Sequence, residues 1–582
     1  MKTYLAITIG PIYRTIERAK KTRELWAASF LLSQLMRILL GKVKKYGTPL
    51  SPDLSRLDTP EKYHGAGIWN DNCYFSVHPG MEDDLRAALP GIIGQAKQEL
   101  LNLILIDWAN DKDKPATGLS ESDLRDILAR HFHAHAVLIK HESTPQQPVL
   151  KALSAHTASA ELRDRFPAQY DDAVSKALFR GKAIRDLYHL GFEAENEPVF
   201  THYRNRFESD KMERRLPSLL EIGIREFRRD ESLFKKIVDK ISDRLQGKSD
   251  DAESEEENQA IIRLLKQKKD AKGLPLLKKR HKYVAIVQSD GDGVGNLITS
   301  EPDEGRIRAI SEALMNFSVQ AVKKIVAYDG LPVYAGGDDL LFMAPLRNHR
   351  GQNLFDLIRQ INEVFAAQNL PEGASLSFGI SIFYYKYPLG EALENGRDLL
   401  NKLAKKLVYH EGTLQGPLRK KKALAFRVML HGGQSFASVL RQDGDTWREW
   451  TGLLAAHAGN DAAFVSGVIH SLERLGWLLQ QACAMGTAEA FFEKHFNEAK
   501  NTPRWAFVEQ VRTLAEAIYR EYGPLDIKPA DKNHFFTSQL DLPPGKYPNA
   551  DYTDDKLHGM YCNNLLYSAL RLIQFLNAED HE

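Results

Sequence analysis

Cysteine is scarce in this chain of 582 residues, which contains only Cys73, Cys483 and Cys562. Because no two of them form a CxxC pair, the sequence supports neither a disulfide framework nor a thiolate zinc site, and we expect no zinc. No run of about 18 apolar residues occurs, which argues against a membrane span. The apolar N-terminal run is also too short for a signal peptide. These absences predict a cytoplasmic protein.

An excess of charge of either sign is missing as well. Lys and Arg number 78 against 77 Asp and Glu, for a formal net charge of +1. Any attraction to nucleic acid must therefore come from local patches rather than from the net field. Hydrophobic residues at 43% and charged residues at 27% are ordinary for a globular protein, and the length predicts several domains.

The hydrophobic pattern predicts an α+β fold in which one order of elements occurs twice. The first set is a strand over 3–9, a helix over 13–46, two short strands within 67–77 around an Asn70–Asn72 turn, and a helix over 82–104. The second set is a strand over 282–289, a helix over 305–328, strands over 332–335 and 340–344, a helix over 353–367, a strand over 375–383 and a helix over 389–408. Both sets resemble the ferredoxin-like βαββαβ plan.

Four domains follow from these patterns. We predict a first α+β domain over 1–145, a mainly helical linker domain over 146–280, a second α+β domain over 281–430 and a helical C-terminal domain over 431–582. The acidic run 249–257 in the linker domain is interpreted as a mobile loop, because it lacks aromatic residues and repels itself.

Three aspartates are predicted to meet at one edge of the second α+β domain. Asp290 follows an apolar strand, and Asp338 and Asp339 follow the turn residues Gly336 and Gly337 on a hairpin. Clustered carboxylates repel one another unless cations neutralise them, and magnesium or manganese prefers oxygen ligands. Two such ions can activate an attacking hydroxyl and stabilise a leaving pyrophosphate. The motif therefore predicts nucleotidyl transfer from a nucleoside triphosphate.

The alternative is that both motifs are ordinary surface turns, because Gly and Asp are favoured in turns for backbone reasons alone. Either motif by itself would leave that alternative strong. Their joint occurrence, each at the end of an apolar strand and in the order that a shared site requires, favours the metal site.

Two longer segments carry a family resemblance. Residues 289–295 (SDGDGVG) and 334–342 (YAGGDDLLF) resemble the second palm of the large signalling subunit of type III CRISPR effector complexes. The opening segments IGPIY, AKKTRELW and SFLLS, at 9–13, 19–26 and 29–33, resemble the start of its Cmr subtype. The resemblance implies two palm domains with ATP between them, where only the second palm carries GGDD and the first is degenerate.

The resemblance also implies roles for individual residues. Lys405 resembles a lysine of related cyclases whose ammonium reaches triphosphate oxygens, although a solvated lysine on an amphipathic helix is an equal alternative. Asp71 is interpreted as a residue that meets the acceptor molecule, or more plainly as a turn former. The full set of expected nucleotide-binding residues is Gly336, Gly337, Asp292, Lys405, Ser29 and Asp71.

Nuclease activity is not expected from the sequence. Members of this family commonly begin with a nuclease domain that carries a His-Asp pair, and no such dipeptide precedes the first palm here. His131, His133 and His135 alternate along the chain, but no carboxylate partner is evident, so metal binding is not predicted for them.

The leading hypothesis is an RNA-activated adenylyl transferase that makes a nucleotide second messenger. The acceptor is either a second ATP, which gives cyclic oligoadenylate, or S-adenosylmethionine. The expected partners are other Cmr-type subunits, guide RNA and target RNA. One alternative is a non-catalytic scaffold subunit of the same complex, and another is a free-standing dinucleotide cyclase. Co-purification of RNA and sibling proteins would separate the cyclase from the other two.

Overall fold

The computed structural model describes most of the chain. It leaves out residues 60, 111–118, 162–170, 194–196, 205–211, 245–254, 271–272, 411–417, 457–461, 497–503, 523–553 and 581–582. Within the described ranges, no helix has both the length and the apolar character needed to cross a membrane.

The first palm is a four-stranded antiparallel sheet with the order β2-β3-β1-β4. The side chains of its central strand β1 alternate between two cores, as a strand buried on both faces requires. Leu5, Ile7 and Ile9 face the large core shared with the helix α2, and Tyr4 and Ala6 face a smaller core with the helix α5. The elements are β1 (Lys2–Gly10), α1 (Ile12–Ile16), α2 (Thr22–Val43), β2 (Gly47–Ser51), β3 (Asn72–Val77), α3 (Glu82–Ile104), α4 (Glu121–His131), β4 (His133–His141) and α5 (Val149–Glu161).

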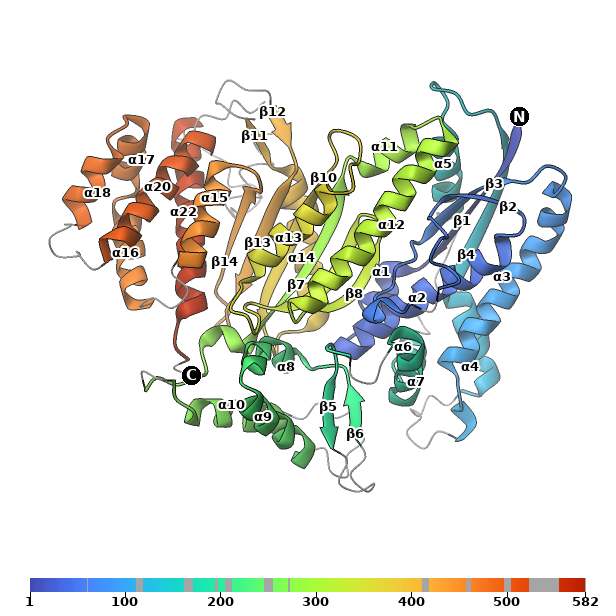
Figure 1. Cartoon of the computed structure of the whole chain (residues 1–582), viewed down its shortest axis with the longest axis horizontal. Coiled ribbons are helices and arrows are strands. Elements are labelled where there is room, and N and C mark those ends of the chain that lie inside the picture. The colour runs from blue at the N-terminus through green and yellow to red at the C-terminus, as the bar shows by residue number, and fades with distance from the viewer. Residues whose placement is uncertain are drawn as a thin grey trace.

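The second palm repeats this plan and extends it. Its sheet has the order β14-β13-β10-β7-β9-β8, and the β8-β9-β7-β10 part matches β2-β3-β1-β4 strand for strand. Figure 1 shows α12 and α13 side by side along this sheet. The elements are β7 (Tyr283–Asp292), α11 (Val294–Ser300), α12 (Glu304–Ala327), β8 (Leu331–Gly336), β9 (Asp339–Pro345), α13 (Leu354–Ala366), β10 (Ser375–Tyr384), α14 (Leu389–Asp398), β13 (Ala423–Met429) and β14 (Ser435–Arg441).

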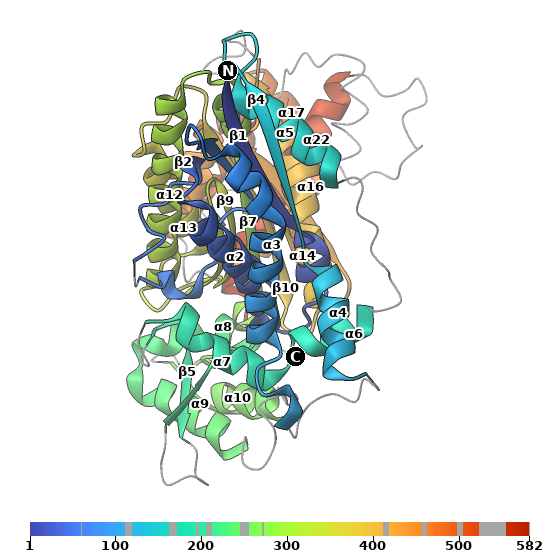
Figure 2. The same cartoon turned by 90° about the vertical axis from the view of Figure 1, so that its right-hand side faces the viewer.

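The linker elements lie along the lower edge of both palms, and the C-terminal helices pack beyond β14 (Figures 1 and 2). The linker elements are α6 (Asp171–Leu178), α7 (Gly181–Gly191), β5 (Thr201–Arg204), β6 (Met212–Arg215), α8 (Leu219–Gly223), α9 (Glu231–Arg244) and α10 (Glu255–Gln267). The C-terminal helices are α15 (Asp445–Ala456), α16 (Ala462–Arg474), α17 (Gly476–Ala484), α18 (Ala488–Phe496), α20 (Trp505–Tyr522) and α22 (Asp554–Asn577).

The structure confirms the α+β class and most of the expected elements, but three expectations were wrong. The expected helix over 13–46 is two helices, α1 and α2. The two strands expected within 67–77 do not form a hairpin, because Gly67 pairs with β8 of the second palm and β3 pairs with β1 and β2. The expected helix over 389–408 gives way after Asp398 to a π-helical turn, Leu399–Leu403, and a 3₁₀ turn. Of the acidic run, 249–254 lies outside the described residues, and Glu255 begins α10.

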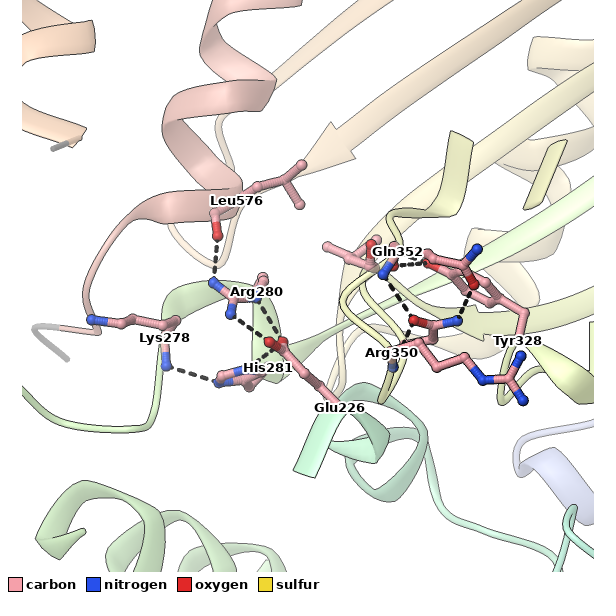
Figure 3. Close-up of polar contacts among 10 residues, drawn as sticks. Glu226, Lys278, Arg280, His281, Tyr328, Arg350, Gln352 and Leu576 are labelled. Carbon is pink, nitrogen blue, oxygen red and sulfur yellow. Dashed lines mark hydrogen bonds and ion pairs between the residues drawn. The ribbon is translucent and has the colours of Figure 1, made fainter. Parts of the chain in front are cut away.

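A buried ionic cluster ties the linker, the second palm and the last helix together (Figure 3). Glu226 accepts two hydrogen bonds from the Arg280 guanidinium, at 2.9 and 3.0 Å, and one from His281 Nε2 at 2.9 Å. Arg280 also donates to the carbonyl of Leu576 at the end of α22, over 2.7 Å. Burial lowers the pKa of His281 to about 4, so the ring is neutral at pH 7 and donates from Nε2 while Nδ1 accepts from the Lys278 amide.

Replacing Glu226 with Gln is expected to lower the free energy of unfolding by about 3–5 kcal/mol, because it leaves the buried Arg280 charge without a counterion. The matched control is Glu363→Gln, which removes an exposed partner of Arg359 and should change stability by less than about 0.5 kcal/mol. Differential scanning calorimetry of both variants is the measurement. Equal shifts in the two transition temperatures would contradict the ionic role of Glu226.

Candidate active site

The turn between β8 and β9 carries the two aspartates of the predicted site. Gly337 has a φ of 67°, in the left-handed region that glycine adopts without strain. β9 then pairs antiparallel with β7, so that Ser289 lies opposite Leu340 and Asp290 is brought to the level of Asp339. Asp338 packs on the backbone of β7, since a Cβ placed on Gly291 would lie 2.6 Å from the Cβ of Asp338. The fold therefore brings Asp290, Asp338 and Asp339 together as the sequence predicted.

The three carboxylates repel one another. Burial, and next the charge of Asp290, raises the pKa of Asp338. Asp339 is exposed and lines the pocket between the palms. Desolvation by the surrounding residues, followed by the charges of Asp338 and Asp290, raises the pKa of Asp339 well above the usual value. The Lys405 ammonium forms an ion pair with Asp290 and offsets part of the repulsion. The site thus holds more negative charge than its single lysine neutralises.

The first palm reaches directly onto the strand that precedes this turn. Gly67 N–H donates to the Val333 carbonyl at 3.3 Å, and Ala335 N–H donates to the Gly67 carbonyl at 2.9 Å. Ser29 Oγ donates to the same Val333 carbonyl at 3.1 Å, which is a structural role for a residue that also lines the pocket. Gly67 permits this approach because a Cβ there would lie 2.9 Å from the Cβ of Ser33.

Asn70 and Asp71 of the first palm lie near the turn between β8 and β9. A Cβ on Gly337 would lie 2.9 Å from Asn70 Nδ2, so the Asn70 amide packs against the glycines of the turn. Asp71 immediately precedes β3, in the place where Asp338 precedes β9 in the second palm. Its carboxylate accepts a hydrogen bond from Asn72 Nδ2 at 2.9 Å, and burial, the largest cause, raises its pKa.

A pocket of about 450 Å³ lies between the palms. The second palm contributes Asp290, Asp339 and Arg397, and the first contributes Ser29 and Asp71. Lining residues to which the sequence analysis gave no role include Tyr13, His133, Glu161 and Arg397. No sequence motif marks Glu161 as a pocket residue, because it is the last residue of α5, which follows the last strand of the first palm.

Charged groups of the first palm also line this pocket. The Thr8 hydroxyl donates to Glu161, and the charge of Glu161 is among the causes that raise the pKa of Asp71. Desolvation, and next the charge of Asp339, raises the pKa of Tyr13. The ring of Tyr13 lies 5.1 Å from the Arg397 guanidinium. Acidic side chains of both palms therefore line the pocket.

Asp292 is placed differently from the other candidates. Its Oδ2 accepts hydrogen bonds from Ser375 Oγ at 2.9 Å, from Ser377 Oγ at 2.7 Å and from the Lys422 amide at 2.9 Å. The residue is 3% exposed and does not line the pocket between the palms. In this arrangement Asp292 anchors the start of β13 to the end of β7, and its nucleotide-binding role stays a prediction.

Divalent metal suits the donor set, although in the described part of the chain no three His, Cys, Asp or Glu side chains are already arranged around a metal position. The observation in favour is electrostatic, because Asp338 and Asp339 hold raised pKa values through burial and mutual repulsion. Hard oxygen ligands with unneutralised negative charge are what magnesium or manganese binds. Asp290, Asp338 and Asp339 as metal ligands stay a prediction.

The fold and the pocket define a class of protein in which two ferredoxin-like palms face each other and one carries an acidic turn. Residues 283–411 match the family described as Cas10/Cmr2, second palm domain, and residues 4–96 match CRISPR-associated protein Cmr2, N-terminal. These two matches, one in each palm, confirm the resemblance inferred from the sequence.

Relatives of this chain are known in sequence and in structure. The CRISPR system Cmr subunit Cmr2 of Pyrococcus furiosus is 36% identical over 149 residues, an alignment that covers 21% of this chain and 17% of that protein. A structure titled type III-B Cmr-beta in the apo state superposes with a TM-score of 0.52 at 12% identity, over 75% of this chain and 70% of that one. The structure of type III-B Cmr-beta bound to cognate target RNA superposes with a TM-score of 0.52 at 12% identity, over 76% of this chain and 71% of that one. At this identity, the two structures establish the shared fold.

Proposed function

We propose that this protein is an adenylyl transferase of a type III CRISPR effector complex, which makes a nucleotide second messenger from ATP. An acceptor hydroxyl forms a bond to the α-phosphorus of ATP, the bond from that phosphorus to the bridging oxygen breaks, pyrophosphate leaves and the hydroxyl loses its proton. The observation that carries the proposal is that Asp290 and Asp339 of one palm and Asp71 of the other line one pocket of about 450 Å³. In this proposal the second palm binds the ATP that donates AMP, and the first palm binds the acceptor.

Each candidate residue has a defined part in this reaction. Asp290, Asp338 and Asp339 would hold two magnesium or manganese ions, which when bound activate the hydroxyl and neutralise the triphosphate. Gly336 and Gly337 leave the backbone of the turn open to phosphate oxygens because they carry no side chain. Lys405 now pairs with Asp290, and its ammonium is placed to move to a triphosphate oxygen when cations take over that carboxylate.

The acceptor wall favours a cationic molecule. Asp71 and Glu161 both line the first-palm side, and the charge of Glu161 is among the causes that raise the pKa of Asp71. A positive group between two carboxylates is stabilised, whereas a triphosphate there is repelled. S-adenosylmethionine carries such a group as its sulfonium and ammonium, so this observation supports it over a second ATP. Transfer to ATP, with cyclic oligoadenylate as the product, is the alternative.

We also propose that the protein works within an assembly of Cmr-type subunits with guide RNA and target RNA. The support is the match to the Cas10/Cmr2 palm and the likeness to the structure of type III-B Cmr-beta bound to cognate target RNA. A scaffold subunit without activity is the alternative within that assembly, and the complete set of second-palm aspartates argues against it. A free-standing dinucleotide cyclase would need neither the first palm nor the C-terminal helices.

The test is product analysis by mass spectrometry. The purified complex is incubated with ATP and magnesium, with and without S-adenosylmethionine, and with and without target RNA. The proposal expects AMP joined to S-adenosylmethionine or cyclic oligoadenylate, together with pyrophosphate, only when target RNA is present. Intact ATP under every condition would support the scaffold alternative, and RNA-independent product from the isolated chain would support the free-standing cyclase.

Replacing Gly337 with Ala is expected to reduce AMP transfer by about 10- to 100-fold, because misplacing a catalytic group by about 1 Å has effects of that order. The added methyl group meets Asn70 and places a side chain at a φ of 67°. Gly486→Ala is the matched control, since Gly486 has a φ of 69° and nothing within 4 Å of the new Cβ. Both variants should lose about 1–2 kcal/mol of stability from strain. An equal loss of turnover in both would mean that strain, rather than the geometry of the turn, is responsible.

A further inference from the structure

A second cavity, of about 410 Å³, lies where the two palms and the linker meet. None of its lining residues lines the pocket between the palms. The first palm contributes His64, the linker Pro198 and Arg228, and the second palm contributes Lys323, Val326, Ala327, Asp329, His349 and Arg350. The volume suits a ligand of about the size of a nucleotide.

Two histidines of this cavity are held by buried carboxylates. His64 Nδ1 lies 2.7 Å from Glu197 Oε2, and His349 Nδ1 lies 2.6 Å from Asp329 Oδ2. Asp329 Oδ2 also accepts the His349 backbone N–H at 3.0 Å, which fixes the ring relative to its own backbone. Because Nδ1 of each ring is engaged, Nε2 is the atom left to bind a ligand. The hydrogen bond that His64 donates to Glu197 raises the pKa of His64 and favours its protonated form.

The neighbouring charges decide which kind of ligand fits. Histidines oriented by carboxylates are typical of metal sites, but a metal site also needs an excess of negative charge. Arg228, Lys323 and Arg350 line the same cavity, and among its described lining residues Asp329 is the one carboxylate. Asp329 is itself neutralised, since Arg228 Nη1 lies 3.3 Å from its Oδ1 and His349 binds its Oδ2. Lys323 Nζ lies 3.6 Å from Glu61 Oε1, so Arg350 is the cation of the cavity that no described carboxylate neutralises. Its charge repels a metal ion and attracts an anion.

Arg350 supplies a guanidinium on a rigid support. Its loop is closed by Asn348 Oδ1, which accepts the amides of Arg350 at 3.0 Å and of Gln352 at 2.9 Å. Figure 3 shows the Arg350 side chain extending from this loop. Within the described part of the chain, the guanidinium has no hydrogen-bond or ion-pair partner. A guanidinium presents paired N–H groups that match phosphate oxygens.

We propose that this junction cavity is a phosphate-binding site, with single-stranded RNA as the ligand whose phosphodiester occupies it. Arg350 supplies the charge that no described carboxylate neutralises, Lys323 adds a cation for which a phosphate competes with Glu61, and the Nε2–H of protonated His64 is a directed donor. This site does not depend on the nucleotidyl transfer proposed above.

Occupancy of the site would bear on the pocket between the palms. His64 has a φ of 50° between Tyr63 at 47° and Gly65 at 85°, so the ligand would contact a turn of three successive left-handed residues. Three residues further on, Gly67 pairs with β8, and the same segment continues to Asp71. A bound phosphate would therefore hold in place the segment that joins the two palms.

The test measures RNA binding to the full chain in EDTA, which removes metal-dependent binding of phosphates between the palms. The probe is a fluorescein-labelled 12-nucleotide oligouridine, followed by fluorescence anisotropy as a function of salt. The double variant Lys323→Gln, Arg350→Gln is expected to bind RNA about tenfold or more weakly. The slope of the logarithm of its binding constant against the logarithm of the salt concentration should be smaller in magnitude by about 1.4, which is about 0.7 for each lost phosphate contact. Arg359→Gln, an exposed arginine on α13 outside the cavity, is the matched control and should bind as the wild type does.

Competition with ATP and with inorganic phosphate distinguishes the sources of phosphate. If RNA binding weakens in the double variant while neither competitor displaces RNA from the wild type, the ligand is the RNA backbone. If ATP or phosphate displaces RNA from the wild type but not from the double variant, a free phosphate compound shares the site. Equal binding of RNA by the wild type and the double variant, or equal losses in the double variant and the control, would overturn the proposal. Circular dichroism melting of each variant verifies that it is folded.

Discussion

Replacing both Asp338 and Asp339 with Ala is expected to abolish AMP transfer, with a loss of turnover of about a thousandfold or more. The two carboxylates would hold the metals that supply several kcal/mol of transition-state stabilisation, and each 1.36 kcal/mol corresponds to a factor of ten in rate. The fold should persist, because burial and mutual repulsion raise the pKa of both groups and their removal relieves that cost. Mass spectrometry of products and a pyrophosphate assay give the turnover.

The control for this variant is Asp83→Ala, Asp84→Ala. It removes two adjacent exposed aspartates from the first turn of α3, so it makes the same change in charge away from the pocket. Turnover near that of the wild type is expected for it. Chelation of divalent metal should reproduce the loss in the wild type, and added magnesium or manganese should restore it. Unimpaired transfer by the Asp338 and Asp339 variant would refute the assignment of the catalytic turn.

The Asp71→Asn variant should separate the two candidate acceptors. Asn keeps the shape and the hydrogen bonding of the side chain but removes the charge from the first-palm wall. A charge-assisted contact contributes on the order of 1.5–3 kcal/mol, which corresponds to a drop of about tenfold to hundredfold in transfer to S-adenosylmethionine. Transfer between two ATP molecules should fall much less, because a triphosphate gains nothing from a nearby carboxylate.

Both products are to be measured from one preparation of the Asp71→Asn protein. Asp58→Asn is the control within the same palm, since Asp58 is an exposed partner of Lys44. Equal losses of both products would mean that Asp71 has a structural role or binds metal. If neither product changes, Asp71 is a turn residue and the electrostatic case for a cationic acceptor fails.

The sequence predicted that the three aspartates meet at one sheet edge, because the relevant signals are local. Asp290 follows one apolar strand, Asp338 and Asp339 begin another, and the βαββ order makes those strands neighbours. Partner choice is not local, and this explains the wrong hairpin at 67–77. The apolar pattern marks Gly67 to Trp69 as extended, but it does not say that Gly67 pairs with a strand more than 260 residues later.

Two parts of the site were beyond sequence reasoning for related reasons. Glu161 reaches the pocket only because α5 packs on the far face of the first-palm sheet, through Val149, Leu150 and Leu153. Asp292 lies two residues from Asp290, and its proximity in the chain suggested a shared role. In the structure Ser375, Ser377 and the Lys422 amide surround its carboxylate, so the geometry of β10 and β13, rather than the spacing, sets its place.

The contact between Gly67 and β8 also protects the sheet of the second palm. β8 is the edge strand of six, and an edge strand presents unpaired N–H and C=O groups on which another chain can add a strand. The backbone of Gly67 forms hydrogen bonds with the Val333 carbonyl and the Ala335 amide, and the Ser29 hydroxyl donates to the Val333 carbonyl as well. The segment that completes the pocket therefore also caps an edge prone to aggregation. A second palm produced without the first would lose this cap along with its acceptor wall, so the pair of palms is the smallest unit suited to study in isolation.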